Sequence, residues 1–474
     1  MTQLQTYAVR KIGTHRGSPR LWLEGREPTK GGFLPGTRFN TRVDPDRALL
    51  VLEAVEDGVR IVSGKQRGDG QIPVIDINSK ELLAMFEGIE AVRVVVQDGR
   101  ISILPMASEL RARERLIRLK DKLARGEPLT TGSVSAGAGI LDRAAHEGLE
   151  LAGVKAKLAF TNEIREDCVA HMCKVNPIVD DETVTLTAPM QELAFDEWAM
   201  SQLPKVDVLV GGIPCSGASR AGRAKRGANH AEAHPEVGHL VVAFLAIIAK
   251  VNPVAVVLEN VPIWATSASM CILSNQLRDL GYELHETIVR SAEWNVLEHR
   301  ERLCVVAVTK GVSFSFDALE RPAPMERHFG EIMDQVEHDA SCWSEMSYLK
   351  EKRERDEEKG SNFKMTVLTP QSTSVPCLNK TLWKRQSTGA FVSHPVNPDL
   401  LRLPTVNEHA RAKGVWPDMV DGVGLTFGHE ILGQSVTVPP FRSVFKLLGF
   451  ALQAFARQAT NAFQPMLMPR LMAA

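Results

Sequence analysis

Short stretches of alternating apolar and polar residues characterise the first 105 residues of the chain. Strings such as RLWLEG, VRIVSG and RISILP alternate in this way, and turn formers such as RGDG separate them. Period-two alternation bounded by turns is typical of half-buried β-strands. We therefore predict a β-rich N-terminal domain over residues 1–105, and two uses of it stay open, as a DNA-binding or as a dimerisation module.

The following stretch, residues 106–128, consists of helix formers with many basic side chains, in the string SELRARERLIRLKDKLARG. Its apolar positions form only a broad stripe, so the pattern predicts a basic linker helix. A solvated helix surface is the default interpretation of its charge, and contact with DNA phosphates is the alternative.

From residue 129 the pattern alternates between apolar strands and helices. VDVLVGGIPC and VAVVLENVP are two of the strands, and HLVVAFLAIIAKV is a helix between them. This alternation predicts an α/β fold with a parallel sheet covered on both faces and ligands at the carboxyl ends of its strands. The strings SAGAG, NE, GGIPC and ENVP would then surround one crevice.

The alternation stops near residue 311 and returns near residue 401. The intervening segment is rich in Ser, Thr, Lys and Gln, which predicts a small inserted domain suited to polar contacts. We therefore divide the rest of the chain into a main domain at 129–310, the insertion at 311–400, a return to the main domain at 401–458 and a flexible tail at 459–474.

The composition of the 474 residues, 44% hydrophobic and 24% charged, is that of a globular protein and excludes disordered and fibrous classes. The longest apolar run, residues 240–249, is shorter than the roughly 20 residues of a membrane span. The N-terminus lacks the apolar segment of a secretory signal. We expect a cytoplasmic protein with no membrane partner. Seven cysteines without a CxxC pair predict neither a disulfide framework nor a zinc site.

The formal net charge of -1 conceals local excesses of positive charge. Residues 1–50 carry nine Lys and Arg against four acidic residues, and Arg220, Arg223 and Lys225 follow Cys215 closely. Phosphate binding depends on such local charge rather than on the total. A near-zero net charge is therefore compatible with a nucleic-acid partner.

Two of the predicted strand ends carry features of a nucleotide site. The glycine-rich turn at Ser135–Gly139 lies between a strand and a helix, where it either binds a nucleotide-like ligand or is simply a tight turn. Glu163 lies at the end of the next strand, where an acid can accept both hydroxyls of a ribose.

Two other strand ends carry candidate catalytic groups. Cys215 lies beside cations that favour the thiolate, and it is either a nucleophile or an inert core residue. Glu259 ends an apolar strand, where a carboxylate needs a partner or a proton. A salt bridge to Arg300 or Arg302 is the structural alternative to a catalytic role for Glu259.

The motifs occur in one order: SAGAG, NE, GGIPCSGAS, LENVP, EHRERLCVVAV, an insertion, RLPTVNEHARAKGVWPD and GQSV. In this order and spacing the chain closely resembles the cytosine-specific C5 DNA methyltransferase family from residue 130 to about 452. The resemblance implies a Rossmann-like, S-adenosylmethionine-dependent methyltransferase domain, with the 311–400 insertion as its target recognition domain. The N-terminal 105 residues lie outside the resemblance.

The resemblance also implies a mechanism on a cytosine that is rotated out of duplex DNA. Cys215 would add to C6, Glu259 would act on N3, Arg302 would contact O2, and Arg300 would steady the Cys215 loop or a nearby phosphate. No metal is implied. The methyl donor, S-adenosylmethionine, would have its ribose on Glu163, its adenine near Ile164 and its remaining contacts with Gly137, Gly139, Ile140, Gln434 and Ser435.

Some positions depart from the family's pattern. Ser135 replaces an aromatic residue before the glycines, Ser216 replaces a Gln after Pro-Cys, and Glu298 stands where Gln opens the Q-x-R-x-R element. We expect a DNA (cytosine-5-)-methyltransferase, either solitary or partnered by a cognate restriction endonuclease. The alternatives are a tRNA methyltransferase, whose branch has a Cys-Phe-Thr signature absent here, and a DNA-binding regulator with a relic catalytic domain.

Overall fold

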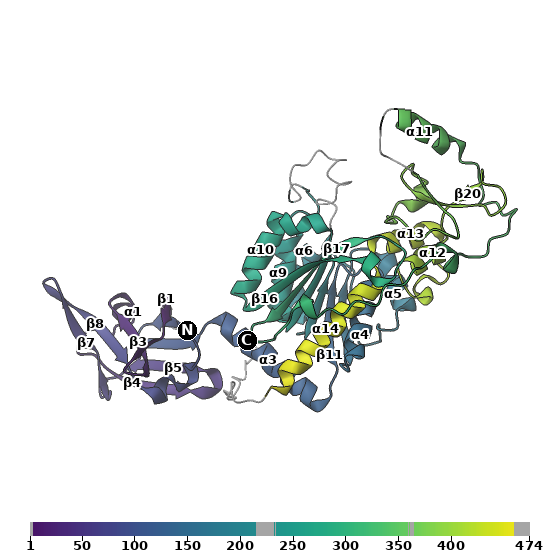
Figure 1. Ribbon diagram of the computed structural model, residues 1–474. Helices are drawn as coiled ribbons and strands as arrows, with labels where there is room; N and C mark the ends of the chain where they lie inside the picture. Colours follow the sequence, from purple (N-terminus) through teal and green to yellow (C-terminus); the bar gives the residue numbers. More distant parts are fainter. Residues whose placement is uncertain (1–2, 215–231, 233, 359, 361–364, 459–474) are drawn as a thin grey trace. The chain divides into compact units, whose positions relative to one another are not determined.

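The computed structural model describes residues 3–214, 232, 234–358, 360 and 365–458 (Figure 1). The chain divides into two compact units, one ending at Glu114 and the other extending from Arg115 to Arg457. Each unit has its own hydrophobic core. The tail predicted at 459–474 lies outside the described residues.

Two antiparallel sheets form the first unit, which confirms the predicted β-rich N-terminal region. The larger sheet has the strand order β1-β9-β10-β5-β4-β6 and the smaller the order β2-β3-β8-β7. Both contribute apolar side chains to one core. The elements are β1 (Leu4–Lys11), β2 (Gly13–His15), β3 (Ser18–Glu24), α1 (Arg26–Lys30), β4 (Arg38–Asp44), β5 (Leu49–Ala54), β6 (Arg60–Ile61), β7 (Ser63–Arg67), β8 (Gly70–Ile77), α2 (Lys80–Leu83), β9 (Ala91–Gln97) and β10 (Arg100–Pro105).

A seven-stranded sheet in the order β13-β12-β11-β14-β15-β17-β16 lies at the centre of the second unit, confirming the predicted α/β fold. Five neighbouring strands are parallel, whereas β17 runs antiparallel to both of its neighbours. A short connection joins β16 to β17, and this forces the reversal. The strands are β11 (Leu129–Val134), β12 (Ala156–Asn162), β13 (Val184–Leu186), β14 (Val208–Gly211), β15 (Ala255–Asn260), β16 (Tyr282–Arg290) and β17 (Glu301–Thr309).

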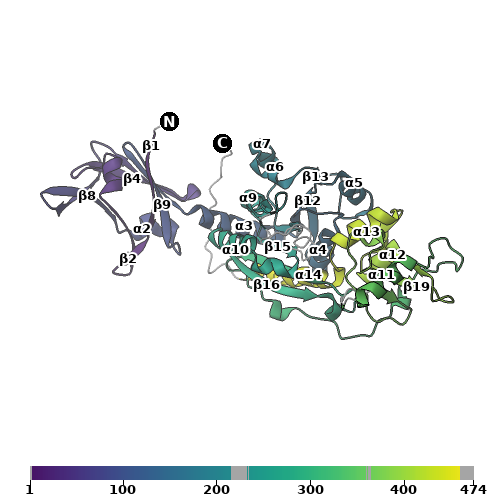
Figure 2. The same ribbon diagram turned by 90° about the horizontal axis from the view of Figure 1, so that it is seen from above.

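Helices cover both faces of this sheet (Figure 1). On one face α4 packs against α14 so closely that a Cβ at Gly148 would lie 2.4 Å from the Arg442 carbonyl oxygen. On the other face lie α6, α9 and α10 (Figure 2). No helix among the described residues is long and apolar enough to cross a membrane. The helices are α4 (Ile140–Leu151), α5 (Glu166–Val175), α6 (Met190–Phe195), α7 (Glu197–Gln202), α9 (Leu240–Val251), α10 (Ala268–Asp279), α12 (Val406–Ala412), α13 (Leu425–Gln434) and α14 (Val438–Arg457).

The insertion has a small sheet and a core of its own. Its strands are β18 (Thr366–Leu368), β19 (Ala390–Ser393) and β20 (Leu401–Arg402), and the charged run forms helix α11 (Ser347–Glu358). Val312, Phe314 and Leu319 instead pack into the main core with α14. The separate core therefore begins later than residue 311, and we call residues 320–403 the inserted domain.

Three basic residues of the linker helix α3 (Ala107–Arg125) are buried or largely buried rather than solvated. Arg115 is 1% exposed; its Nε donates to Thr309 Oγ1 over 2.7 Å, and its guanidinium stacks 3.8 Å from the Tyr282 ring centroid. Arg118 and Lys122 donate to the buried Asp207 carboxylate. A solvated surface is therefore the wrong interpretation for these three cations, because they bind the domain that follows.

Candidate active site

The glycine-rich turn and Glu163 meet at the carboxyl ends of β11 and β12. Gly137 N–H donates to Glu163 Oε2 over 2.8 Å, and Arg165 N–H donates to Glu163 Oε1 over 3.1 Å. Ser135, Gly137 and Gly139 all have positive φ angles, of 57°, 58° and 72°. The turn thus carries the chain from β11 to the start of α4 while its backbone holds the carboxylate in place.

Two of the turn's glycines are required for different reasons. At Gly139 a Cβ would lie 2.6 Å from Asn176 Nδ2, and this amide also donates to the Gly139 carbonyl over 2.9 Å. At Gly137 a Cβ would meet nothing within 4 Å, so this glycine leaves open space above the turn. The sequence did not single out Asn176, because its role depends on a contact between separate helices.

Helix α13 approaches the end of β12 and brings a second set of predicted residues to this edge. Arg165 and Glu430 form an ion pair of 3.2 Å between the two segments. Ile164 is 62% exposed, and Gln434 at the end of α13 is also exposed. Ser435 ends the helix, with its hydroxyl donating to Leu432 O over 2.8 Å. The apolar side chain of Ile164 and the polar side chain of Gln434 are therefore exposed, whereas Ser435 is partly buried.

Glu259 forms its ion pair with Arg302, so the structure selects one of the two partners that the sequence left open. Arg302 Nε lies 2.7 Å from Glu259 Oε1, and the two side chains are 15% and 14% exposed. In the register of β15 and β17, Glu259 is opposite Cys304, which puts Arg302 one diagonal step away on the same face. Both charged groups thus remain partly accessible at a strand end.

The chain entering the predicted nucleophile is anchored to the same edge of the sheet. Asn260 Nδ2 donates to the Ile213 carbonyl over 3.1 Å, and Gly212 N–H donates to the Val134 carbonyl over 3.1 Å. These bonds connect the ends of β11, β14 and β15. Cys215 itself, together with the basic loop that follows it, lies outside the described residues.

Arg300 lies buried between α13 and the inserted domain, and the Cys215 loop that it was predicted to steady lies outside the described residues. The Arg300 side chain is 3% exposed, and it donates to the Gly433 carbonyl over 2.9 Å and to Cys377 Sγ over 3.2 Å. Neighbouring Glu298 and Cys377 raise the pKa of the guanidinium against the opposing effect of burial. The side chain bridges α13 and the inserted domain, and its burial separates it from a phosphate at the surface. Sequence reasoning did not predict that Arg300 contacts Glu298 and Cys377. The one sequence signal was Glu298 itself, which stands where the family has Gln.

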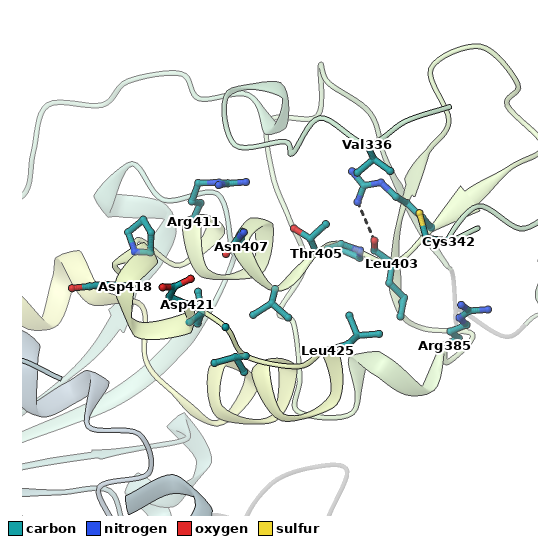
Figure 3. Close-up of a pocket in the computed structure, with 17 residues that line it drawn as sticks. Val336, Cys342, Arg385, Leu403, Thr405, Asn407, Arg411, Asp418, Asp421 and Leu425 are labelled. Atoms are coloured by element: carbon teal, nitrogen blue, oxygen red, sulfur yellow. Dashed lines mark hydrogen bonds between the residues drawn. The ribbon is translucent and has the colours of Figure 1, made fainter. Parts of the chain in front are cut away.

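A separate cavity of about 730 Å³ lies beside α12 and α13 (Figure 3). Its lining includes Cys342 and Arg385 from the inserted domain and Thr405, Asp421 and Leu425 from the chain that follows. None of the predicted site residues lines it. Within the described part of the chain, no group of three or more His, Cys, Asp or Glu side chains could hold a metal ion.

The largely parallel sheet, the glycine-rich turn after β11 and the acid at the end of β12 define a Rossmann-like domain of the kind that binds nucleotide-like ligands. Similarity to a known family narrows this class of fold to one kind of enzyme family. The chain belongs to the C-5 cytosine-specific DNA methylase family, whose model matches residues 129–449.

Individual relatives are distant. The Type II methyltransferase M1.ScrFI of Lactococcus lactis subsp. cremoris is 26% identical over 249 residues, which cover 51% of this chain and 62% of that protein. M.MspI of Moraxella sp is 26% identical over 263 residues, covering 54% and 59% respectively. The chain thus matches about three fifths of the length of these curated relatives.

Solved structures share the fold at lower identity. The Dnmt2 methyltransferase of S. pombe has a TM-score of 0.52 and 18% identity, with 69% of this chain and 99% of that chain covered. The methyltransferase EhMeth of Entamoeba histolytica has a TM-score of 0.53 and 16% identity, covering 69% and 98%. The N-terminal unit lies outside the match to the family model.

Proposed function

We propose that the protein transfers a methyl group from S-adenosylmethionine to C5 of a cytosine in duplex DNA. The observation that carries the proposal is the accessible Glu259–Arg302 pair, 2.7 Å apart at the edge where the chain enters Pro214 and Cys215. A carboxyl group and a guanidinium side by side match N3 and O2, which are neighbouring atoms on one edge of the cytosine ring.

The four candidate catalytic residues divide into two kinds. Cys215, Glu259 and Arg302 would touch the base, whereas Arg300 would act through its contacts with Gly433 and Cys377. Arg302 also keeps Glu259 in place before the base arrives, so the pair is oriented in advance. Arg300 is therefore proposed as a positioning residue.

The proposed reaction begins with addition of the Cys215 thiolate to C6 of the cytosine, which forms an S–C6 bond and moves the C5–C6 electron pair towards C5. Glu259 promotes this shift by giving a proton or a strong hydrogen bond to N3. S-adenosylmethionine, when bound, would supply its sulfonium methyl group to C5, with the electron pair of the broken S–CH3 bond staying on sulfur. A base then removes the C5 proton, the released pair re-forms the C5–C6 double bond and expels the Cys215 thiolate, and N3 returns to Glu259 any proton it received.

The residues at the turn fit S-adenosylmethionine. Each Glu163 oxygen accepts one backbone N–H, and a carboxylate has about four acceptor sites in all, so both ribose hydroxyls can also be bound. The space above Gly137 admits a ligand close to the backbone, where Gly139 and Ile140 follow. Exposed Ile164 offers an apolar surface for adenine, and Gln434 and Ser435 offer polar groups for the methionine end.

Recognition of the duplex is proposed for the inserted domain. Its residues 380–388 include Lys380, Lys384 and Arg385, cations that can bind phosphates or base edges. The relatives named as Type II methyltransferases make a cognate restriction endonuclease the partner to look for, and a solitary enzyme is the other form of this proposal.

Label transfer tests the proposed function. Purified protein is incubated with S-adenosylmethionine labelled in the methyl group and, separately, with unmethylated duplex DNA and with tRNA. We expect label in DNA as 5-methylcytosine, no label in DNA from Cys215→Ala, and full activity for Cys173→Ala, an exposed cysteine on α5. Label in tRNA alone contradicts the DNA substrate, and an active Cys215→Ala protein contradicts the covalent mechanism.

A further inference from the structure

Three charged side chains meet in the interior behind the proposed active site. Glu298, Arg300 and Lys413 are 0%, 3% and 0% exposed. Lys413 Nζ lies 3.0 and 2.9 Å from the two Glu298 carboxylate oxygens, and Arg300 Nη1 lies 3.4 Å from Glu298 Oε1. One carboxylate therefore pairs with two cations that come from segments more than a hundred residues apart.

Glu298 also connects this cluster to the inserted domain. Leu378 N–H donates to Glu298 Oε1 over 3.3 Å. The backbones on either side are bridged, because His299 N–H donates to Val375 O and Val375 N–H donates to Leu297 O, each over 2.8 Å. The segment leading to Arg302 is thus held against the domain proposed to recognise DNA.

Arg300 connects the same cluster to the cofactor side. Its Nη2 donates to the Gly433 carbonyl, directly before Gln434 and Ser435. A Cβ at Gly433 would lie only 2.2 Å from Lys380 N, so the last turn of α13 packs on the backbone of the inserted domain. A change at Glu298 would consequently reach both the Arg302 segment and the end of α13.

We propose that Glu298 and Lys413 are a positioning pair. Through their contacts they hold the Arg302 segment, proposed to bind the base, and the end of α13, proposed to bind the cofactor, in fixed positions against the inserted domain. The inference rests on the proposed function and names residues that act through others. Neither side chain is exposed, so neither touches substrate. The pair also gives a physical reason for the departure at Glu298, since a carboxylate there neutralises Lys413.

Charge predicts how variants of the pair behave. The three side chains carry a net charge of +1 when ionised. Glu298→Gln leaves two buried cations without a counter-ion, which is strongly unfavourable. Lys413→Gln leaves a balanced Glu298–Arg300 pair, and the double variant restores the original net charge. Glu298→Gln leaves two buried cations without their carboxylate in the wild-type background and only Arg300 in the Lys413→Gln background, so its effect should be larger in the first than in the second.

Titration of Lys413 gives a second readout. Burial, with Arg300 nearby, lowers the pKa of Lys413 to about 8. Burial also lowers the pKa of His409 on α12, the next neighbour, well below its ordinary value, so His409 stays neutral. The charged or titratable groups that face this cluster are Glu298, Arg300, Cys377, His409 and, through a 3.0 Å contact with His409, His429.

Four full-length proteins test the inference: wild type, Glu298→Gln, Lys413→Gln and the double variant. Calorimetry measures the Kd for S-adenosylmethionine, and label transfer measures the rate at saturating DNA. We expect Glu298→Gln to weaken both by about tenfold or more in the wild-type background, and by a clearly smaller factor in the Lys413→Gln background. Glu301→Gln, a change at an exposed neighbouring acid, should leave both unchanged.

The pH profile separates positioning from folding. A thiol such as Cys215 also titrates between about pH 7 and 9, so the readout is the ratio of the wild-type rate to the Lys413→Gln rate, in which a common Cys215 titration cancels. This ratio should change with a midpoint near pH 8. Equal losses from Glu298→Gln in the two backgrounds would overturn the pairing. If Glu298→Gln does not fold, a ratio that stays constant from pH 7 to pH 9 overturns it instead. A wild type that binds S-adenosylmethionine but labels no DNA contradicts only the proposed function, because the calorimetric comparison still tests the pair.

Discussion

Glu259 and Arg302 derive their arrangement from neighbouring antiparallel strands rather than from proximity in the chain. Their side chains lie on the same face, one diagonal step apart, with 14% and 15% exposure. A carboxyl group in this position is oriented by the guanidinium and remains accessible to a ligand. Arg300, two residues earlier, precedes β17 and is buried. Because alternation alone would put residues two apart on the same face, the deeper burial of Arg300 reflects the packing of α13 and the inserted domain around it.

At the residue scale we predict that Glu259→Gln lowers the rate of methyl transfer at saturating substrates by roughly 10²- to 10⁴-fold, the usual contribution of a proton donor. Gln is isosteric and can still accept from Arg302, so the fold should persist. Single-turnover label transfer measures the rate, and circular dichroism checks the fold. Glu301→Gln, at a side chain 58% exposed, is the matched control. A Glu259→Gln rate within threefold of the control would exclude Glu259 as a proton donor in the reaction.

At the scale of elements, helix α3 is anchored by a buried carboxylate in the segment before β14. Asp207 is 0% exposed and binds Arg118 Nε over 2.9 Å, Lys122 Nζ over 2.6 Å and Thr130 N–H over 2.8 Å. These partners hold the pKa of Asp207 below its ordinary value despite burial. The helix and the first strand of the large sheet therefore share one acidic anchor.

We predict that Asp207→Asn lowers the free energy of unfolding by about 3 kcal/mol at pH 7, because it removes the counter-ion of two partly buried cations. The folded pKa is depressed, so the stabilisation is complete above the unfolded pKa of about 3.9 and is lost as pH falls through the folded value. The difference between variant and wild type should accordingly shrink below about pH 4.

Urea unfolding at pH 7 and at decreasing pH measures this difference. Glu127→Gln, which breaks an exposed pair with Arg125, is the control and should change little. A difference between Asp207→Asn and wild type that stays constant down to pH 3 would contradict the assignment of the effect to this carboxylate.

At the scale of the whole molecule, the N-terminal unit has a core separate from that of the second unit. Residues 129–449 match the family model without it. Because α3 contributes Leu116 and Leu119 to the core of the second unit, a truncation must keep this helix. The basic N-terminal fifty residues can add phosphate contacts, which strengthen DNA binding without entering the reaction.

We predict that a protein starting at residue 106 folds cooperatively and binds DNA roughly tenfold more weakly at low salt, with a smaller dependence of affinity on salt. Its rate at saturating DNA should equal that of the full chain. Fluorescence anisotropy at several salt concentrations measures affinity, and single-turnover label transfer measures the rate. A slower chemical step at saturating DNA would show that the N-terminal unit takes part in catalysis.

Hydrophobic periodicity in the sequence alone predicted most of the strands and helices of this protein. The strands and helices around residues 129–310 follow from local alternation, and Glu163 and Glu259 could be assigned to strand ends because parallel strands end at a common edge. The glycines of the Ser135–Gly139 turn were predictable for the same local reason, since the turn requires positive φ angles.

Only the tertiary structure decided which charges meet. Arg115 could not be recognised as buried, because its acceptor Thr309 is 194 residues away. The choice of Arg302 over Arg300 as the partner of Glu259 depended on strand register, and the Glu298–Lys413 pair joins residues 115 positions apart. Periodicity reports the face on which a side chain lies, whereas its partner is set by packing between distant segments.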